Sequence, residues 1–200
     1  MAGATASDID REAESSIKKA RGRPSFKGYR GRKSDPPFPS SICASLNEEV
    51  VHGIATKTKV LNNGDIFTID IGMEYPINSG LGRYGNGFFT DTALTLAIGS
   101  ITPAPKLLLE RTYESLLKGI AVARVGNSIA TIGKAVEDYI KPFGYGIVRD
   151  LVGHGVGYLV HEDPRIPNYY DASLEKIKLV PGMVLAIEPM ITLGSHEVET

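Results

Sequence analysis

DIFTIDIGM (Asp65–Met73) and NGFFTDTALTLAIG (Asn86–Gly99) are the two segments that decide the fold of this 200-residue chain. The first alternates with a period of two, which is the pattern of a strand that buries one face. Its apolar face carries Phe67, Ile69 and Ile71, and its polar face carries Thr68 and Asp70. The second segment is rich in β-branched and aromatic residues and is also predicted to be a strand. EYPINSGLGRYG, between them, is typical of a long hairpin loop.

Helices are predicted before and after this strand pair in the sequence. One starts after Ser7 and ends by Gly22, and another runs from Thr102 to about Arg124. A third starts near Ser128 and stops at Gly144. Short extended pieces are expected in SICASLN, VVHGI, YGIVRDLV, GHGVG and GMVLAIEPMI. This order indicates an α+β fold, in which helices cover one face of a mostly antiparallel sheet.

The composition limits the class of protein. Hydrophobic residues make up 42% and charged residues 22%, which is ordinary for one globular domain, here residues 1–200. The net charge of −1 excludes bulk attraction to nucleic acid or membrane, and the basic run from Lys18 to Lys33 is interpreted as a solvated surface. Cys43 is the single cysteine, so no intrachain disulfide can form. With a polar N-terminus and no long apolar run, we expect a cytoplasmic protein without a membrane segment.

Four residues in strand or glycine-rich segments suggest a metal site. Asp70, Asp91 and Glu188 lie in apolar strand segments, where an unpaired carboxylate is costly. His154 lies between glycines in LVGHGVG, where neighbouring backbone can approach closely. Any one of them could be structural, as an N–H acceptor or an ion-pair partner. These strand segments contain no Lys or Arg, so as a set the four residues predict a divalent metal site.

Six blocks occur in the order found in type I methionine aminopeptidases: SICASLNEEVVHGI, GDIFTIDIG, FFTDTALT, GYGIVRDLVGHGVG, VHEDPRIPNY and PGMVLAIEPM. The chain resembles this family from about Phe26 to Leu193. The resemblance implies the pita-bread (creatinase/aminopeptidase-like) fold, a mostly antiparallel curved sheet covered by helices. It also implies removal of the initiator methionine from nascent proteins, with a preference for a small second residue.

The resemblance assigns roles to individual residues. Asp70 would chelate one metal ion, Asp91 would bridge two, and His154 and Glu188 would complete the ligand set. Glu188 would also help to deprotonate the attacking water. His161 would stabilise the tetrahedral intermediate, and His52 would contact the substrate amide and aid proton transfer. The complete enzyme would hold two divalent metal ions, which could be Co, Mn, Fe or Zn.

The methionine pocket is also implied by the resemblance. Tyr29, Phe38 and Cys43 match family positions that line a small apolar cavity, beside which His52 and His161 would contact the substrate. An aromatic ring and a thiol suit a flexible thioether. Ordinary core packing is an equal alternative for these three residues.

Two loops depart from the family pattern. The segment from Gly31 to Phe38 is longer than usual, which could move the rim of the pocket. Asp70 and Asp91 stand 21 residues apart (91 − 70), further than the tight hairpin of the family allows. If the two strands pair beneath this insertion, both aspartates can still face one site.

A third departure concerns the fifth metal ligand, a glutamate that the family carries after the IEPM block. The chain ends at Thr200, and Glu197 and Glu199 are too close to Glu188 to replace it. We therefore expect a fragment, truncated at both ends and incomplete at the C-terminus. Four ligands would hold at most one ion tightly, with little peptidase activity.

Two other functions remain open. One is another pita-bread peptidase, of the aminopeptidase P or prolidase kind, although SICASLNEEVVHG favours the methionine enzymes. The other is a catalytically dead pita-bread protein that binds at the ribosome. As partners we expect the N-termini of nascent polypeptides and the ribosome, and no membrane, and we expect the protein to be a monomer.

Overall fold

The computed structural model describes residues 2–82 and 86–199, and it divides into two compact units. The first unit consists of the residues up to Thr102 together with Gly157–Val160. The second consists of Pro103–Val156 and the residues from His161 onward. The assignment of the chain to one catalytic domain stays a prediction.

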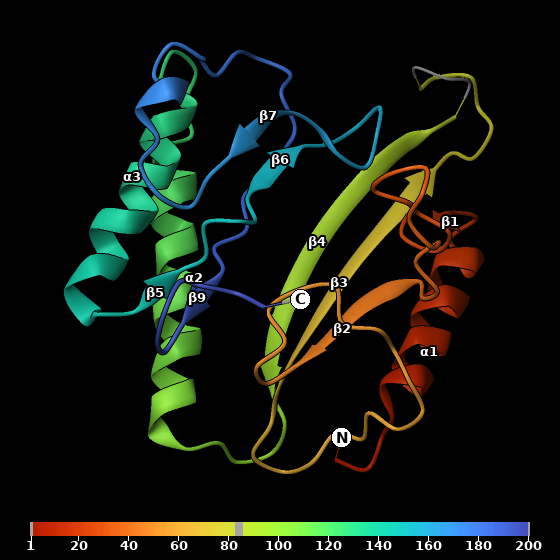
Figure 1. The fold of residues 1–200 in the computed structure, drawn as a ribbon. Helices are drawn as coiled ribbons and strands as arrows, with labels where there is room; N and C mark the ends of the chain where they lie inside the picture. Colours follow the sequence, from red (N-terminus) through yellow and green to blue (C-terminus); the bar gives the residue numbers. More distant parts are fainter. Residues whose placement is uncertain (1, 83–85, 200) are drawn as a thin grey trace. The chain divides into compact units, whose positions relative to one another are not determined.

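A four-stranded antiparallel sheet forms the first unit (Figure 1). Its strands are β1 (Arg23–Pro24), β2 (Ile42–Leu46), β3 (Ile66–Tyr75) and β4 (Phe88–Ala97). β3 pairs with the other three, and its ladder with β4 runs without a break from Ile66↔Ala97 to Tyr75↔Phe88. The predicted hairpin is therefore confirmed. Part of its loop, residues 83–85, lies outside the described residues.

The two faces of this sheet differ in polarity, as the alternation in the sequence predicted. Helix α1 (Ala6–Lys19) lies along this sheet (Figure 1). Its Ala6, Ile9 and Ala13 pack with side chains of β2 and β3 on the apolar face. The β2 and β3 residues of this core are Ile42, Ala44, Leu46, Phe67, Ile69 and Ile71. The opposite face carries Thr68 and Asp70, so burial of the apolar face determines which way the carboxylate points.

The start of α1 differs from the prediction. Thr5 is the N-cap: its hydroxyl accepts the N–H of Asp8 at 3.1 Å, and the Asp8 carboxylate accepts the N–H of Thr5 at 3.2 Å. Ser7, the expected start, lies inside the helix because Asp10, three residues beyond it, is used elsewhere. The Asp10 carboxylate accepts the N–H groups of Ser41 at 2.7 Å and Ile42 at 3.1 Å, which fastens α1 to the start of β2.

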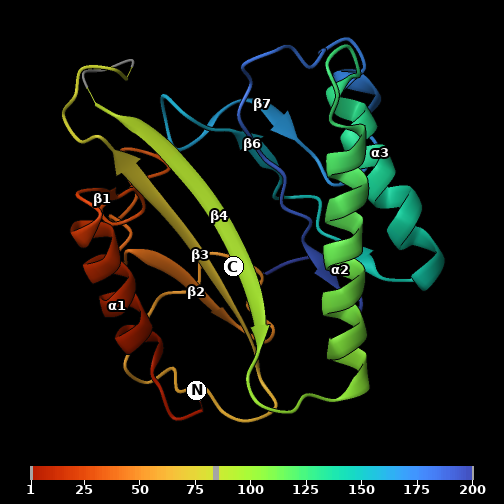
Figure 2. The ribbon, with the colours of Figure 1, turned by 180° about the vertical axis from the view of Figure 1, so that it is seen from behind.

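The second unit contains two long helices and two small antiparallel sheets (Figure 2). α2 (Pro103–Val122) and α3 (Ile129–Ile140) pack against each other, and short 3₁₀ turns follow at Lys141–Phe143 and Ala172–Leu174. β5 (Gly146–Ile147) pairs with β9 (Ile191–Thr192). β6 (Gly153–Gly155) lies between β7 (Glu162–Ile166) and β8 (Leu185–Ala186). Ile129, Ile132, Ile166 and Leu179 form the buried core.

Two short segments were predicted wrongly. VVHGI forms no strand, because its backbone turns at His52 with a φ of 56°. The residues after His161, which were not among the expected extended pieces, form β7. Within the described parts of the chain, none of the helices is both long enough and apolar enough to cross a bilayer.

Candidate metal-binding residues and substrate pocket

Asp70 and Asp91 lie on one face of the β3–β4 ladder. Asp91 is opposite Gly72, which is two residues after Asp70 on the same strand. Residues two apart share a face, so the two carboxylates are diagonal neighbours, about 7–8 Å apart at Cα. The prediction that both aspartates face one way despite the long insertion is confirmed by this register.

Gly72 leaves room beside Asp91. A Cβ at this position would come within 2.2 Å of Ser25 Oγ and 2.7 Å of the carbonyl oxygen of Thr90. The backbone of Ser25 crosses here, and its N–H donates to the Gly72 carbonyl at 3.1 Å. The segment that contains Ser25 can therefore cross the carboxylate face of the sheet only because position 72 has no side chain.

In the second unit, His154 is positioned by glycines on both sides. A Cβ on Gly153 would come within 2.2 Å of the carbonyl oxygen of Ala186, and one on Gly155 within 2.5 Å of that of Asp163. The two glycines thus allow β7 and β8 to approach β6 closely. The close backbone approach inferred from LVGHGVG is confirmed.

Hydrogen bonding determines which nitrogen of His154 is available. Nδ1 lies 2.9 Å from the carbonyl oxygen of Gly155, which can only accept, so Nδ1 carries the proton. Nε2, with its lone pair, lies 3.4 Å from Glu188 Oε1. The Glu188 backbone is held by Asn168, whose side-chain amide donates to its carbonyl at 2.9 Å. An imidazole oriented by a backbone carbonyl and facing a carboxylate is typical of a metal ligand pair.

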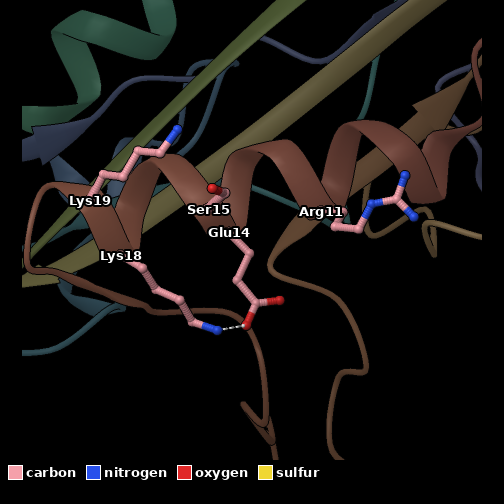
Figure 3. A pocket seen from close by; sticks show the side chains of 5 residues that line it. All are labelled: Arg11, Glu14, Ser15, Lys18 and Lys19. Atoms are coloured by element: carbon pink, nitrogen blue, oxygen red, sulfur yellow. Dashed lines mark ion pairs between the residues drawn. The ribbon is translucent and has the colours of Figure 1, made fainter.

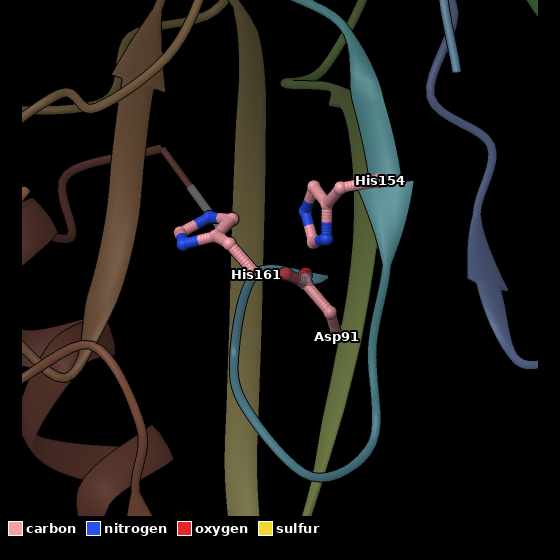
Figure 4. A group of neighbouring side chains, drawn as sticks. All are labelled: Asp91, His154 and His161. Carbon is pink, nitrogen blue, oxygen red and sulfur yellow. The ribbon is translucent and has the colours of Figure 1, made fainter. Parts of the chain in front are cut away.

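His161 lies beside His154. Their ring centroids are 4.4 Å apart in an edge-on arrangement, and their ring nitrogens lie within 4.8 Å of one another (Figure 4). The β6–β7 hairpin brings them together, because Gly155 pairs with Glu162. Asp91, also drawn in Figure 4, belongs to the first unit. Three predicted site residues, His154, His161 and Glu188, are thus neighbours within the second unit.

The residues of the expected methionine pocket gather in the first unit. Phe38 packs on a buried cluster of Phe26, Cys43 and Val160, each at most 7% exposed, with Phe89 beside it. Tyr29 joins through the backbone, where the Phe38 N–H donates to its carbonyl at 2.8 Å. Cys43 is the β2 partner of Asp70, so this apolar cluster borders the carboxylate face.

Phe26, Phe89 and Val160 were not among the predicted pocket residues. Phe89 could have been found from the alternation of its strand, since it shares a face with Asp91. Val160 could not, because it is distant in sequence from the rest of the cluster.

His52 is held beside β2. The N–H of Ala44 donates to the carbonyl of Gly53 at 2.7 Å, and the Gly53 N–H donates to Ser45 Oγ at 3.2 Å. The left-handed backbone conformation of His52 costs about 1–3 kcal/mol of folding free energy, which the surrounding hydrogen bonds must offset. Although His52 is exposed as a residue, partial desolvation lowers the pKa of its ring, which keeps the imidazole neutral to lower pH.

Lys59 fastens the loop that carries His52. Its Nζ donates to the Ala44 carbonyl at 2.8 Å and to Glu49 Oε2 at 2.5 Å, and only 12% of its side chain is exposed. The same Glu49 oxygen accepts the N–H of Leu46 at 2.8 Å. Lys59 and Glu49 therefore tie both ends of the loop to β2.

Lys59→Met is expected to lower the free energy of unfolding by about 1–3 kcal/mol, because Ala44 and Glu49 both lose a buried donor. It should also lower kcat/KM, because the backbone at His52 loosens. Lys57→Met is the matched control, since that side chain is exposed. Denaturant unfolding and peptide hydrolysis measure the two effects, and equal stability of the two variants would contradict the role of Lys59.

An open hollow along α1 does not belong to the candidate site. It is lined by Arg11, Glu14, Ser15, Lys18 and Lys19 (Figure 3). Glu14 pairs with Lys18 and with Lys27, each at 2.7 Å, and these bonds lower its pKa to about 2. It is therefore a committed ion-pair partner and a poor proton acceptor.

The donor set suits a divalent cation. The first unit offers two carboxylates on one face, and the second offers an imidazole nitrogen facing a carboxylate. Carboxylate and imidazole ligands are those that Mn, Fe, Co and Zn accept. The residues present therefore fit a metal of this class.

Comparison with known proteins agrees with this chemistry. The sequence model of metallopeptidase family M24 matches residues 1–199. A methionine aminopeptidase of Borreliella burgdorferi is 48% identical over 196 residues, which are 98% of this chain and 71% of that protein. The crystal structure of a methionine aminopeptidase from Thermotoga maritima aligns with a TM-score of 0.87 and 36% identity, over 99% of this chain and 73% of that one.

A third comparison bears on the alternative peptidase. The prolidase from Pyrococcus furiosus aligns with a TM-score of 0.73 at 23% identity, over 94% of this chain and 48% of that one, which shows a shared fold alone. The chain therefore belongs to metallopeptidase family M24, and within it to the methionine aminopeptidases. The pita-bread fold and the dependence on divalent metal that the resemblance implied come with this membership.

Proposed function

We propose that this protein is a metal-dependent aminopeptidase that removes the initiator methionine from nascent proteins, with a preference for a small second residue. The observation that carries the proposal is the register of Cys43 opposite Asp70. It places a small apolar cluster directly beside a carboxylate that can hold a metal ion. A methionine side chain in that cluster would leave its amino group at the carboxylates.

We further propose that Asp70, Asp91, His154 and Glu188 are ligands in a site for two divalent ions, of Mn, Fe, Co or Zn, and by themselves hold one of them tightly. When bound, the ions lower the pKa of water and neutralise negative charge on the substrate.

The side chains of this protein supply the proton chemistry. Glu188, already facing an imidazole at 3.4 Å, accepts the proton of the attacking water. His161 donates a hydrogen bond to the oxygen that becomes negative in the tetrahedral intermediate. His52, neutral because desolvation lowers the pKa of its ring, contacts the substrate amide and takes part in proton transfer.

The proposal extends to location and partners. We infer a cytoplasmic monomer that meets the N-termini of nascent polypeptides near the ribosome. Cys43 is buried, and as the single cysteine of the sequence it has no cysteine in the chain with which to form a disulfide, which fits a reducing compartment.

Hydrolysis of Met-Gly peptides against Xaa-Pro peptides tests the function. We expect faster turnover of Met-Gly peptides, loss of turnover with a chelator, and recovery on adding Mn or Co. Faster cleavage of Xaa-Pro peptides would favour a prolidase instead. Metal-independent release of methionine would contradict the proposal.

A further inference from the structure

We propose that the loop Arg30–Pro37 is a subsite for acidic side chains of the peptide substrate, a few residues beyond its methionine. The proposal rests on the proposed function, because it assumes that a peptide N-terminus enters the cluster around Cys43. It makes the substrate class narrower: among peptides with a small second residue, those with acidic residues further on are preferred.

The base of this loop is part of the pocket. The N–H of Phe38 donates to the Tyr29 carbonyl at 2.8 Å, and the N–H of Gly28 donates to the Phe38 carbonyl at 2.8 Å. These hydrogen bonds close the loop at its base, where the two aromatic residues of the expected pocket, Tyr29 and Phe38, lie. Phe38 in turn packs on the cluster that contains Cys43, the strand partner of Asp70.

The loop is folded around Asp35. The Asp35 carboxylate accepts the N–H of Arg32 at 2.7 Å, and the Asp35 N–H donates to the Arg32 carbonyl at 3.0 Å. The guanidinium of Arg30 donates to the Asp35 carbonyl. The single acidic side chain of the loop is thus engaged with the loop backbone.

Arg32 and Lys33 carry the remaining charge. Both residues are exposed, and among residues 2–82 and 86–199 neither forms an ion pair with a carboxylate. They stand at the tip of the loop, where two adjacent cations can meet a ligand with little desolvation of other groups.

Three of the neighbouring basic residues are paired with carboxylates. Lys18 and Lys27 share Glu14 (Figure 3 draws the first of these pairs), and Arg23 pairs with the buried Glu74. Lys19 and Arg21, at the end of α1, also lack such a partner within the described residues. Within the described residues, unpaired positive charge of the basic run therefore remains at the end of α1 and on the loop, and only the loop is closed by the backbone bonds of Tyr29 and Phe38.

The reach of the loop suits a peptide. Lys33 is four residues from Tyr29, so it can lie up to about 13 Å from the pocket before its own side chain is counted. An extended peptide rises about 3.3 Å per residue, so residues about three to five of the substrate cover this distance. Nucleic acid instead gains affinity from many phosphate contacts, which two cations on a chain with a net charge of −1 do not offer.

The test compares Met-Gly-Ala-Asp-Asp-Ala, Met-Gly-Ala-Lys-Lys-Ala and Met-Gly-Ala-Ala-Ala-Ala as substrates of the protein as encoded. Equilibrium binding of the same peptides, with a fluorescent label at the C-terminus, is measured by anisotropy. At low salt we expect kcat/KM and affinity to be about 3- to 10-fold higher for the acidic peptide than for the basic one, and the difference to shrink in about 0.5 M salt.

The double variant R32Q/K33Q should lose this preference and keep its rate on the neutral peptide. K106Q, which removes an exposed cation on α2, is the matched control and should keep the preference. Equal treatment of the acidic and basic peptides by the unaltered protein would overturn the proposal. A preference for the acidic peptide that survives in R32Q/K33Q would also overturn it. The same holds if the variant loses only its binding to an RNA oligonucleotide and treats the peptides as the unaltered protein does.

The two proposals fail in different ways. If no peptide is cleaved and none is bound, the proposed function fails, and the inference about the loop falls with it. If the neutral peptide is cleaved and charge has no effect, only the acidic subsite is wrong.

Discussion

His161→Ala is expected to lower kcat by about 10²-fold or more and to leave the metal content of the protein nearly unchanged. A preorganised donor to a developing oxyanion contributes on this scale, because it acts where charge appears in the transition state. The ring of His161 is exposed and lies edge-on beside that of His154, with centroids 4.4 Å apart. It is therefore placed to reach a substrate bound next to His154.

Steady-state kinetics on a Met-Gly peptide and metal analysis by mass spectrometry check this expectation together. His196→Ala is the control, since His196 is an exposed histidine of the same unit. Loss of metal in His161→Ala would show that His161 is itself a ligand, which the closeness of its nitrogens to those of His154 makes a sharp alternative.

His154→Ala is expected to weaken metal binding by about 10²-fold or more and to abolish turnover for that reason. In the unaltered protein Nδ1 donates its proton to the Gly155 carbonyl, and Nε2 faces Glu188. The variant removes Nε2. Loss of an oriented ligand costs more than the roughly 10- to 100-fold that loss of its supporting hydrogen bond costs.

Calorimetric titration with Mn or Co measures this loss, again beside His196→Ala. Excess metal should restore part of the turnover of His154→Ala but none of that of His161→Ala. If His154→Ala keeps its metal while His161→Ala loses it, the two roles are reversed.

Much of the first unit could be predicted from local pattern. The alternation in Asp65–Met73 placed Phe67, Ile69 and Ile71 on one face and Asp70 on the other, and the register confirms this. A period of two leaves a strand with one buried face little choice of orientation. Glycines on both sides of His154 likewise predicted the close approach of neighbouring backbone.

Features that depend on competition between groups were missed. Thr5 rather than Ser7 caps α1, because Asp10 bonds to Ser41 and Ile42 instead of completing a capping box with Ser7. The strand after His161 was missed because Glu162–Ile166 is extended by its pairing with β6, which local sequence does not show. The clamp between Lys59 and Glu49 depends in the same way on the Ala44 carbonyl, fifteen residues from Lys59.

The sequence by itself indicated the kind of chemistry: carboxylates at Asp70, Asp91 and Glu188 and an imidazole at His154, in apolar or glycine-rich segments where, as a set, they favour a bound cation. Burying a charge is costly, and the apolar residues around each charged residue can be recognised from the sequence alone. Tertiary structure alone decided which atoms are usable. The Gly155 carbonyl selects the tautomer of His154, the β2–β3 register sets Cys43 against Asp70, and β6–β7 pairing brings His161 beside His154. The two strand pairings depend on hydrogen bonds between residues that are distant in sequence. The bond from His154 to the Gly155 carbonyl joins neighbours, but its geometry is set only once the chain has folded.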